Sequence, residues 1–247
     1  MFKRKLNKKI FNSILITSLL VILLVSTFTA SAKTIKTSYL GELDSRPAAV
    51  GANGLVTSID LLASQAGLQI LMKGGNAIDA AVATATTLHV VDYCMSGIDG
   101  NGFTTIYWAP ENKVYNLSMT GAVPYGVDPE KHTPDELAWG YKAGCVPGAF
   151  GGWIQALQRF GTISLKEVLE SAINYAENGQ PVTPVIVKWL EYSKEVLELY
   201  PTSARVFLPN GRFPEIGEMF YMKDLAKTFK KLVAAEQDAL AQGKIQK

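Results

Sequence analysis

Few side chains in this 247-residue sequence combine the residue types and spacing that catalysis requires. His89 lies in an apolar, helix-like stretch, and His132 lies in a proline-rich segment near Glu130 and Asp135. A Ser-His-Asp set can be assembled from almost any sequence, and no G-x-S-x-G motif supports one here. We therefore interpret His89 as a core or partly hydrogen-bonded helix residue, and His132 as a solvated loop residue rather than a base.

Metal binding and phosphate binding find equally little support. The two cysteines, Cys94 and Cys145, form no C-x-x-C or metal-type spacing, and no H-E-x-x-H motif is present. The stretch "MSGIDGNGF" at 95–103 is glycine-rich, but no Lys-Ser or Lys-Thr follows it, as a P-loop needs. It also lies between a helix-like and a strand-like block, which is the reverse of a dinucleotide fingerprint. The residues therefore support neither a metal site nor a phosphate-binding loop.

Composition sets the broad class of the protein. Hydrophobic residues make up 48% and charged residues 19%, which is typical of a globular chain. The formal net charge of +2 owes much to "KRKLNKK" near the start, so nothing indicates nucleic-acid binding. An oxidising compartment would allow Cys94 and Cys145 to pair, but the pattern favours two small buried thiols. Whether they pair stays open.

The first 32 residues read as an export signal. A basic start is followed by the apolar run "IFNSILITSLLVILLVSTFT" and then by "ASA", which predicts a signal peptide at 1–32, cut after Ala32. The apolar run approaches the length that spans a bilayer, so an uncleaved N-terminal anchor is the alternative. Either way, residues 33–247 are expected to be exported, whether secreted, periplasmic or at the cell surface.

The remainder predicts an α+β domain. Asp60 and Asn76 are natural N-caps for two helices, the second with a small-residue face, and Gly74-Gly75 ends the first. "PENK" is good turn chemistry for a β-hairpin, residues 121–147 are loop-rich, and "SLKE" is a capping box. In chain order we expect a short strand at 55–59, helices at 61–73 and 77–91, a hairpin at 103–119, and helices at 147–161, 164–178, 185–199 and 222–242.

Two long stretches resemble one known family. "LASQAGLQILMKGGNAIDAAVATATTLHVVDYCMSGIDGNGF" is similar to the N-terminal signature of the γ-glutamyltransferases, or glutathione hydrolases. That signature reads L-A-S-x-A-G-x-x-I-L-x-x-G-G-N-A-x-D-A-A-V-A and then M-S-G-I-G-G-G-G-F. "GYKAGCVPGAFGGWIQALQRFGTISLKEVLESAINYAENGQPV" resembles the next block of the family, and "DALAQGKI" resembles a late landmark of the large subunit. The likeness runs from about Gly51 to the C-terminus.

The resemblance implies an N-terminal-nucleophile hydrolase with an αββα sandwich. In that family a precursor cuts itself into a large and a small subunit, and a threonine at the start of the small subunit attacks the γ-glutamyl amide. Its own α-amine acts as the base that a weak hydroxyl nucleophile needs. Transfer to water gives hydrolysis, and transfer to an amino acid or peptide gives transpeptidation. No cofactor is implied.

The chain corresponds to the N-terminal part of the large subunit. We expect the nucleophilic threonine to lie beyond its C-terminus, so no catalytic residue is assigned within it and the chain alone is expected to be inactive. Its expected partners are a small-molecule γ-glutamyl or other amide substrate and the missing small-subunit part. A membrane is expected only through the N-terminal anchor.

The sequence departs from the family pattern at three positions. Asp99 and Asn101 stand where glycine is usual, and both tolerate left-handed dihedrals better than most residues. Thr120 stands where the family offers an arginine to the substrate's α-carboxylate, and a hydroxyl cannot reproduce that bidentate pair. Two alternatives stay open: an amidohydrolase or acylase of different specificity whose second half is encoded elsewhere, and a non-catalytic binding module.

Overall fold

The computed structural model describes residues 49–245, apart from residue 139. The chain divides into two units, residues 1–50 and 51–247, and the helices and strands described here belong to the second. The predicted signal peptide at 1–32 lies outside the described residues. Within the described part of the chain, no helix is long and apolar enough to cross a bilayer.

Helices α2 (Leu61–Met72) and α3 (Ala77–Val91) form where the sequence places them. The carboxylate of Asp60 accepts hydrogen bonds from the amides of Leu62 and Ala63, and Asn76 forms a capping box at the start of α3. The small-residue face expected on the second helix lies against α2 at Gly67. A Cβ there would lie 2.1 Å from Thr84 Oγ1, so only a glycine lets the two helices come this near.

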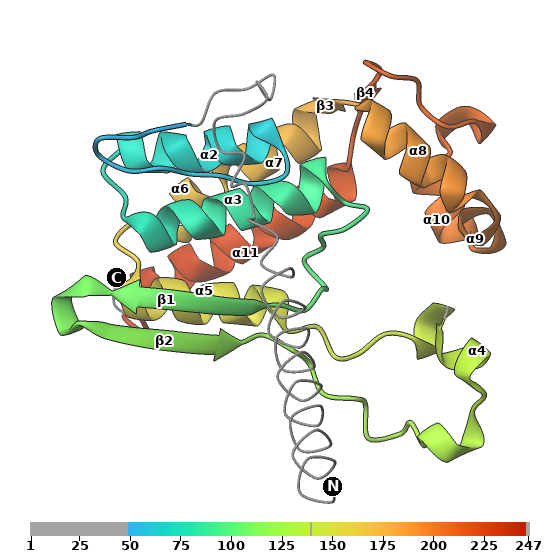
Figure 1. The fold of residues 1–247 in the computed structure, drawn as a ribbon, viewed down its shortest axis with the longest axis horizontal. Helices are drawn as coiled ribbons and strands as arrows, with labels where there is room; N and C mark the ends of the chain where they lie inside the picture. Colours follow the sequence, from blue (N-terminus) through green and yellow to red (C-terminus); the bar gives the residue numbers. More distant parts are fainter. Residues whose placement is uncertain (1–48, 139, 246–247) are drawn as a thin grey trace, which may run out of the picture. The chain divides into compact units, whose positions relative to one another are not determined.

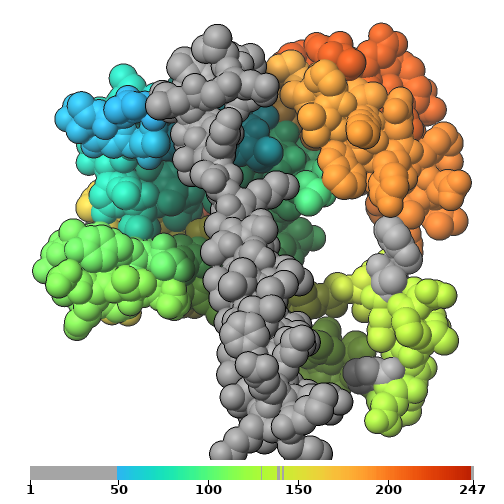
Figure 2. Space-filling view, viewed as in Figure 1, coloured from blue at the N-terminus to red at the C-terminus, as the bar shows by residue number. Residues whose placement is uncertain are grey.

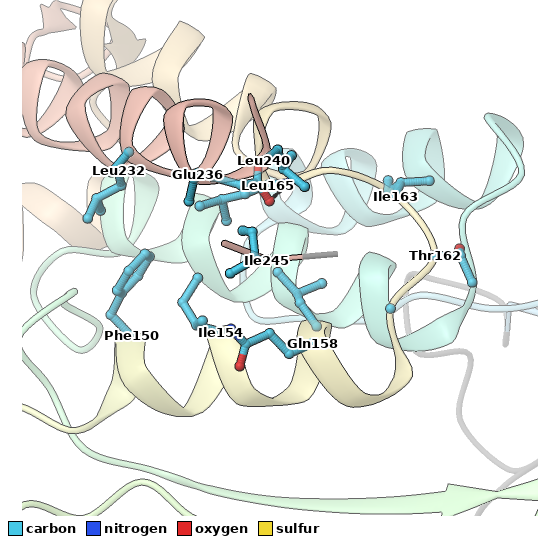
Figure 3. A pocket seen from close by; sticks show the side chains of 14 residues that line it. Phe150, Ile154, Gln158, Thr162, Ile163, Leu165, Leu232, Glu236, Leu240 and Ile245 are labelled. Atoms are coloured by element: carbon cyan, nitrogen blue, oxygen red, sulfur yellow. Dashed lines mark hydrogen bonds between the residues drawn. The ribbon is translucent and has the colours of Figure 1, made fainter. Parts of the chain in front are cut away.

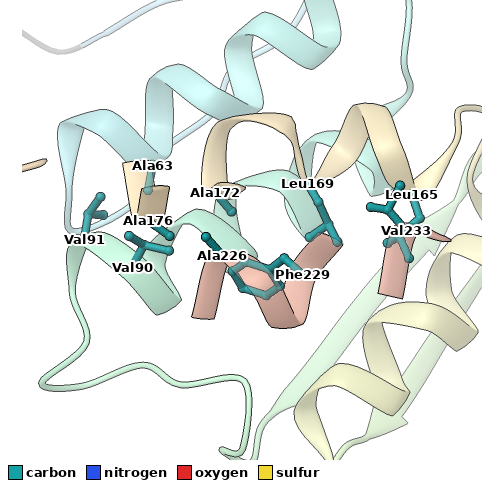
Figure 4. Packing of buried hydrophobic residues seen from close by; sticks show 10 residues of the cluster. All are labelled: Ala63, Val90, Val91, Leu165, Leu169, Ala172, Ala176, Ala226, Phe229 and Val233. Atoms are coloured by element: carbon teal, nitrogen blue, oxygen red, sulfur yellow. The ribbon is translucent and has the colours of Figure 1, made fainter. Parts of the chain in front are cut away.

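The main core lies where α2 and α3 meet three later helices, α6 (Leu165–Val168), α7 (Glu170–Asn178) and α11 (Lys223–Ala241). Phe229 of α11 and Leu169 between α6 and α7 are fully buried at its centre (Figure 4). Small residues such as Ala172 and Ala176 let α7 lie close to α3 and α11. The cluster comprises Ala63, Val90, Val91, Leu165, Leu169, Ala172, Ala176, Ala226, Phe229 and Val233.

The predicted hairpin is confirmed as β1 (Phe103–Trp108) and β2 (Lys113–Ser118), an antiparallel pair in which Phe103 faces Ser118 and Trp108 faces Lys113. One face packs on α5 (Ala149–Phe160), where Trp108 and Tyr115 both contact the ring of Phe160. Helix α5 therefore has the hairpin on one side and α11 on the other (Figure 1).

The other face of the hairpin is uncovered within the described residues. Phe103, Tyr107 and Val114 are 79%, 62% and 60% exposed. In the space-filling view the hairpin, drawn in green, lies at the surface of its unit (Figure 2). These three residues form what we call the outer hairpin face.

A smaller cluster holds the segment between α7 and α11. Strands β3 (Gln180–Pro181) and β4 (Met219–Phe220) pair antiparallel, and Val182, Ile186, Leu190 and Phe220 pack together beside them. The helices of this segment are α8 (Pro184–Tyr192), α9 (Lys194–Leu199) and α10 (Pro201–Phe207). In the described residues of the loop-rich region predicted at 121–147 there is one short helix, α4 (Pro134–Ala138), with 3-10 turns at Pro129–Lys131 and Gly140–Lys142. Further 3-10 turns lie outside this region, at Ala109–Glu111 and Pro209–Gly211.

The α+β class is confirmed, but some predicted elements are wrong in detail. Residues 55–59 form no strand, because β-branched residues alone do not make one without a partner strand. The helix predicted over 164–178 is interrupted at Leu169, whose ψ of −3° ends α6 before α7 begins. Helix α10 and the β3–β4 pair were not predicted.

Candidate functional site

The glycine-rich loop at 95–103 connects α3 to β1 and reaches the start of α5. The carbonyl oxygen of Gly100 accepts hydrogen bonds from the amides of Gly148 (3.2 Å) and Ala149 (2.9 Å). These amides are among the donors that a helix N-terminus leaves without partners, so the loop caps α5 through its backbone. The loop therefore makes contacts within the protein. This agrees with its place between a helix and a strand, which is the reverse of the order in a dinucleotide-binding loop.

The reason for glycine in this loop is close approach rather than a left-handed backbone. Among the described residues, the positive-φ positions lie elsewhere, so Asp99 and Asn101 need no left-handed tolerance. A Cβ at Gly100 would lie 3.0 Å from the carbonyl oxygen of Gly97. The expectation that Asp99 and Asn101 matter through left-handed dihedrals is wrong, because the turn does not use that region.

Asn101 instead joins two distant segments through its side chain. Its Oδ1 accepts the amide N–H of Gly121 at 2.8 Å, and its Nδ2 donates to the sulfur of Cys145. A glycine at this position could make neither contact. Asn101 is thus a contact residue that reasoning from the sequence missed, and its departure from the family pattern was the signal that could have found it.

The segments that Asn101 joins are the two ends of the excursion at 121–147. A Cβ at Gly121 would lie 1.4 Å from the carbonyl oxygen of Val146, and the amide of Val146 donates to Ala122 O at 3.1 Å. On the other side, a Cβ at Gly148 would lie 2.1 Å from the carbonyl oxygen of Met119. The backbones of these segments are therefore in direct contact. We call the region formed by residues 97–102, 119–122 and 145–149 the glycine junction.

Thr120 lies in the glycine junction, two residues after the end of β2. Its neighbour Met119 is buried, and the Met119 amide donates to Gly102 O at 2.9 Å, while Thr120 itself is exposed. The structure thus places the predicted substrate-contact position on an accessible surface whose backbone is held from both sides. Asn101 and Thr120, two of the three positions at which the sequence is expected to depart from the family pattern, both lie in the glycine junction.

His89 is buried and hydrogen-bonded at one ring nitrogen. Its side chain is 5% exposed, and Nδ1 lies 2.9 Å from the hydroxyl oxygen of Ser96. Burial lowers the pKa of His89 to about 4, against a smaller upward effect of the Asp99 charge. The ring is therefore neutral at neutral pH, and its Nε2 has no hydrogen-bond partner among the described residues. This agrees with the prediction of a partly hydrogen-bonded helix residue.

His132 lies in the excursion, half-buried, with Nδ1 3.8 Å from a carboxylate oxygen of Glu136. A hydrogen bond from the Thr133 backbone, helped by Lys142, lowers the pKa of Glu136. His89 on α3 thus contacts Ser96, whereas His132 beside α4 contacts Glu136, so the two histidines have different polar partners. No group of three or more His, Cys, Asp or Glu side chains in the described part of the chain is placed to hold a metal ion.

The two cysteines do not pair. Cys94 and Cys145 are both free and half-buried. Burial, followed by the charge of Asp92, raises the pKa of the Cys94 thiol to about 11, so it stays protonated and packs as a small apolar group against the Val182 cluster. Cys145 instead accepts the hydrogen bond from Asn101.

Asp79 is a second residue that sequence reasoning missed. It is fully buried, and its carboxylate accepts the amide of Asn76 (2.9 Å) and both the amide and the hydroxyl of Thr162, the hydroxyl at 2.6 Å. It therefore ties the start of α3 to the connection that follows α5. Its place three residues after the N-cap Asn76 is a signal that could have found the local bond, but nothing in the sequence pointed to Thr162.

Comparisons with known proteins agree with this arrangement. The family model for gamma-glutamyltranspeptidase matches residues 63–247. The glutathione hydrolase proenzyme of Bacillus subtilis is 36% identical over 95% of this chain, and the acylase ACY 1 proenzyme of Pseudomonas sp. (strain V22) is 39% identical over 80%. The chain spans 41% and 38% of the length of these relatives, which fits an N-terminal portion.

A solved structure extends the likeness to the fold. The gamma-glutamyltranspeptidase of Helicobacter pylori superposes with a TM-score of 0.73 at 31% identity, over 77% of this chain and 56% of that one. The predicted fold class, a portion of an N-terminal-nucleophile hydrolase, is therefore confirmed. The matched residues include most of α2 and all of α3, the hairpin and the glycine junction. The chain therefore belongs to the gamma-glutamyltranspeptidase family.

Proposed function

We propose that this chain is the N-terminal portion of an exported enzyme that hydrolyses or transfers γ-glutamyl amides. The observation that carries the proposal is the family match over residues 63–247, which includes the glycine junction. In the proposed enzyme a self-processed threonine outside these 247 residues is the nucleophile. The chain then supplies the folded support and part of the substrate surface.

The geometry of the described residues supports a nucleophile located elsewhere. Ser96 and His89 lie at hydrogen-bonding distance, but His89 is buried and its pKa is about 4. A general base works best when its pKa lies near the operating pH, so this histidine would accept a proton from serine poorly. The chain by itself should therefore not turn over an amide.

Thr120 favours a second candidate, an acylase or amidohydrolase of different specificity. A threonine hydroxyl cannot make the bidentate, charge-assisted pair that a guanidinium makes with a carboxylate. A substrate without an α-carboxylate would lose nothing by this exchange. The Pseudomonas acylase, 39% identical to this chain, supports the alternative.

The test compares two amides and two proteins. The 247-residue chain and a complete enzyme, made by adding a small-subunit portion of the family, are assayed with a γ-glutamyl anilide and with an acyl anilide that lacks the α-carboxylate. We expect no turnover by the chain alone and turnover of one amide by the complete enzyme. Turnover by the chain alone would refute the assignment of the nucleophile, and no turnover by any complete form would favour a binding module.

Thr120→Arg then separates the two specificities in the complete enzyme. If position 120 contacts the substrate, the arginine should raise kcat/KM for the γ-glutamyl anilide by about tenfold or more, because a charge-assisted hydrogen bond contributes about 1.5–3 kcal/mol. Turnover of the acyl anilide should not rise. An equal effect on both amides would show that position 120 does not read the α-carboxylate.

A further inference from the structure

A groove runs between α5 and the C-terminal half of α11 (Figure 3). It encloses about 330 Å³, which is near the lower end of the range for small-molecule pockets. Phe150, Ile154 and Leu157 form its wall on α5, Leu232 and Leu240 form its wall on α11, and Ile245 lies between them. The groove is therefore concave and largely apolar.

A single carboxylate interrupts the apolar lining. Glu236 on α11 is half-buried, and its Oε1 accepts the amide N–H of Leu165 at 3.0 Å, at the start of α6. Its Oε2 is buried and has no hydrogen-bond partner among the described residues. The hydrogen bond to Leu165 fixes the orientation of the carboxylate. Its other oxygen, Oε2, is therefore also fixed in place but accepts no hydrogen bond.

The neighbouring polar groups do not supply that donor. The hydroxyl of Thr162 is engaged by Asp79 at 2.6 Å, and Gln158 is exposed. Among the described residues that line the groove, Glu236 is the charged one. A buried acceptor without a partner is costly, because the lost hydration is not replaced. An occupant that brings a positive donor would remove this cost.

We propose that the groove binds an amphiphilic organic cation, in which an ammonium or guanidinium group on an apolar body pairs with Glu236. The apolar body contacts the α5 and α11 walls, and the cation pairs with the carboxylate of Glu236, which lines the groove. An anion would be repelled by the carboxylate, and a neutral apolar molecule would leave Oε2 unpaired. This site does not depend on the proposed amide chemistry.

Three probes of equal shape test the role of charge on the full 247-residue chain. Phenethylamine, phenethyl alcohol and phenylacetate share one ring and linker but carry a positive, a neutral and a negative end. Ligand-observed NMR and calorimetry should find saturable binding of the amine, binding of the alcohol weaker by about tenfold or more, and none of phenylacetate. Equal binding of amine and alcohol, or no binding of the amine, would overturn the proposal.

Two substitutions and one control locate the site. Glu236→Gln keeps an oxygen for the Leu165 amide and removes the charge, so it should weaken amine binding about tenfold to hundredfold and leave alcohol binding unchanged. Glu177→Gln removes a comparable carboxylate that pairs with Lys230 outside the groove, and should leave both affinities unchanged. Ile154→Ala should weaken the amine and the alcohol alike. Amine binding that Glu236→Gln leaves intact would refute the pairing.

The chain's own Lys244 is the competing cation. It is exposed and adjacent to Ile245, which lines the groove. If its ammonium normally occupied the groove, Lys244→Gln would strengthen amine binding by removing the competitor, and the groove would then not be a ligand site. Unchanged amine binding in Lys244→Gln supports the proposal.

Discussion

Replacing His89 with glutamine should change how the stability of the fold depends on pH. The folded-state pKa of His89 is about 4, against 6.5 for an unburied histidine, because burial disfavours the charged ring. Between these two values the unfolded state binds more protons than the folded state. The free energy of unfolding therefore falls as the pH drops from 6.5 to about 4, and the full contribution of the neutral ring is present above 6.5.

The size of the effect follows from the shift. One pKa unit corresponds to 1.36 kcal/mol, so the step from 6.5 to about 4 corresponds to about 3 kcal/mol. Asp92 acts in the opposite direction, because burial and the charge of Asp60 raise its pKa. That contribution is common to the native protein and to the variant, so it cancels when the two are compared.

Urea unfolding followed by tryptophan fluorescence, at low protein concentration, measures the difference. His89→Gln keeps a polar group that can bond to Ser96 but does not titrate. As the pH drops from 6.5 to about 4, the free energy of unfolding of this variant should therefore fall by about 3 kcal/mol less than that of the native protein. His132→Gln is the matched control, because that histidine lies in the excursion outside the core, and it should keep the native pH dependence. Parallel curves for the native protein and His89→Gln would refute the reasoning.

Four further outcomes are expected. Asp79→Ala should lower the free energy of unfolding by about 2–4 kcal/mol, since it removes a fully buried acceptor that holds donors of Asn76 and Thr162, whereas the exposed Asp238→Ala should stay within about 0.5 kcal/mol of native. Gly121→Ala should speed proteolysis of the excursion because its Cβ meets Val146 O, whereas Gly126→Ala, with open space around it, should not. The purified chain should self-associate through the outer hairpin face, so Phe103→Ser with Tyr107→Ser should shift it toward monomer in analytical ultracentrifugation, and an unchanged distribution would exclude that face. Secreted material should begin at Lys33 by N-terminal sequencing, and recovery of intact Met1 from membranes would support the anchor instead.

The elements predicted best from the sequence are those defined by their own neighbours in the chain. Asp60 and Asn76 cap α2 and α3 through amides two or three residues away, so a local pattern suffices. The hairpin likewise follows from two β-branched runs and a turn between them. The β3–β4 pair was missed because its two-residue strands are separated by some forty residues, and neither strand carries a period of its own.

The candidate site was harder to predict because its contacts are distant in sequence. Asn101 reaches Gly121 and Cys145, and Asp79 reaches Thr162, across separations of 20 to 83 residues. A local sequence pattern assigns such residues to a loop or to the start of a helix, but it does not identify their distant hydrogen-bond partners. Thr120 entered through the family resemblance, since an exposed threonine after a strand carries no signal by itself.

The two departures at the glycine junction belong to one physical unit. Asn101 accepts the amide N–H of Gly121, the residue that follows Thr120, so its side chain holds the backbone next to the position at which we expect the family to offer an arginine. Restoring arginine at position 120 would therefore change the charge without changing how its backbone is held. Restoring glycine at position 101 would release the backbone and leave the charge as it is. Because the two residues share Gly121, their effects on substrate selection should not be additive, and Asn101→Gly with Thr120→Arg should be compared with each single change in a double-mutant cycle.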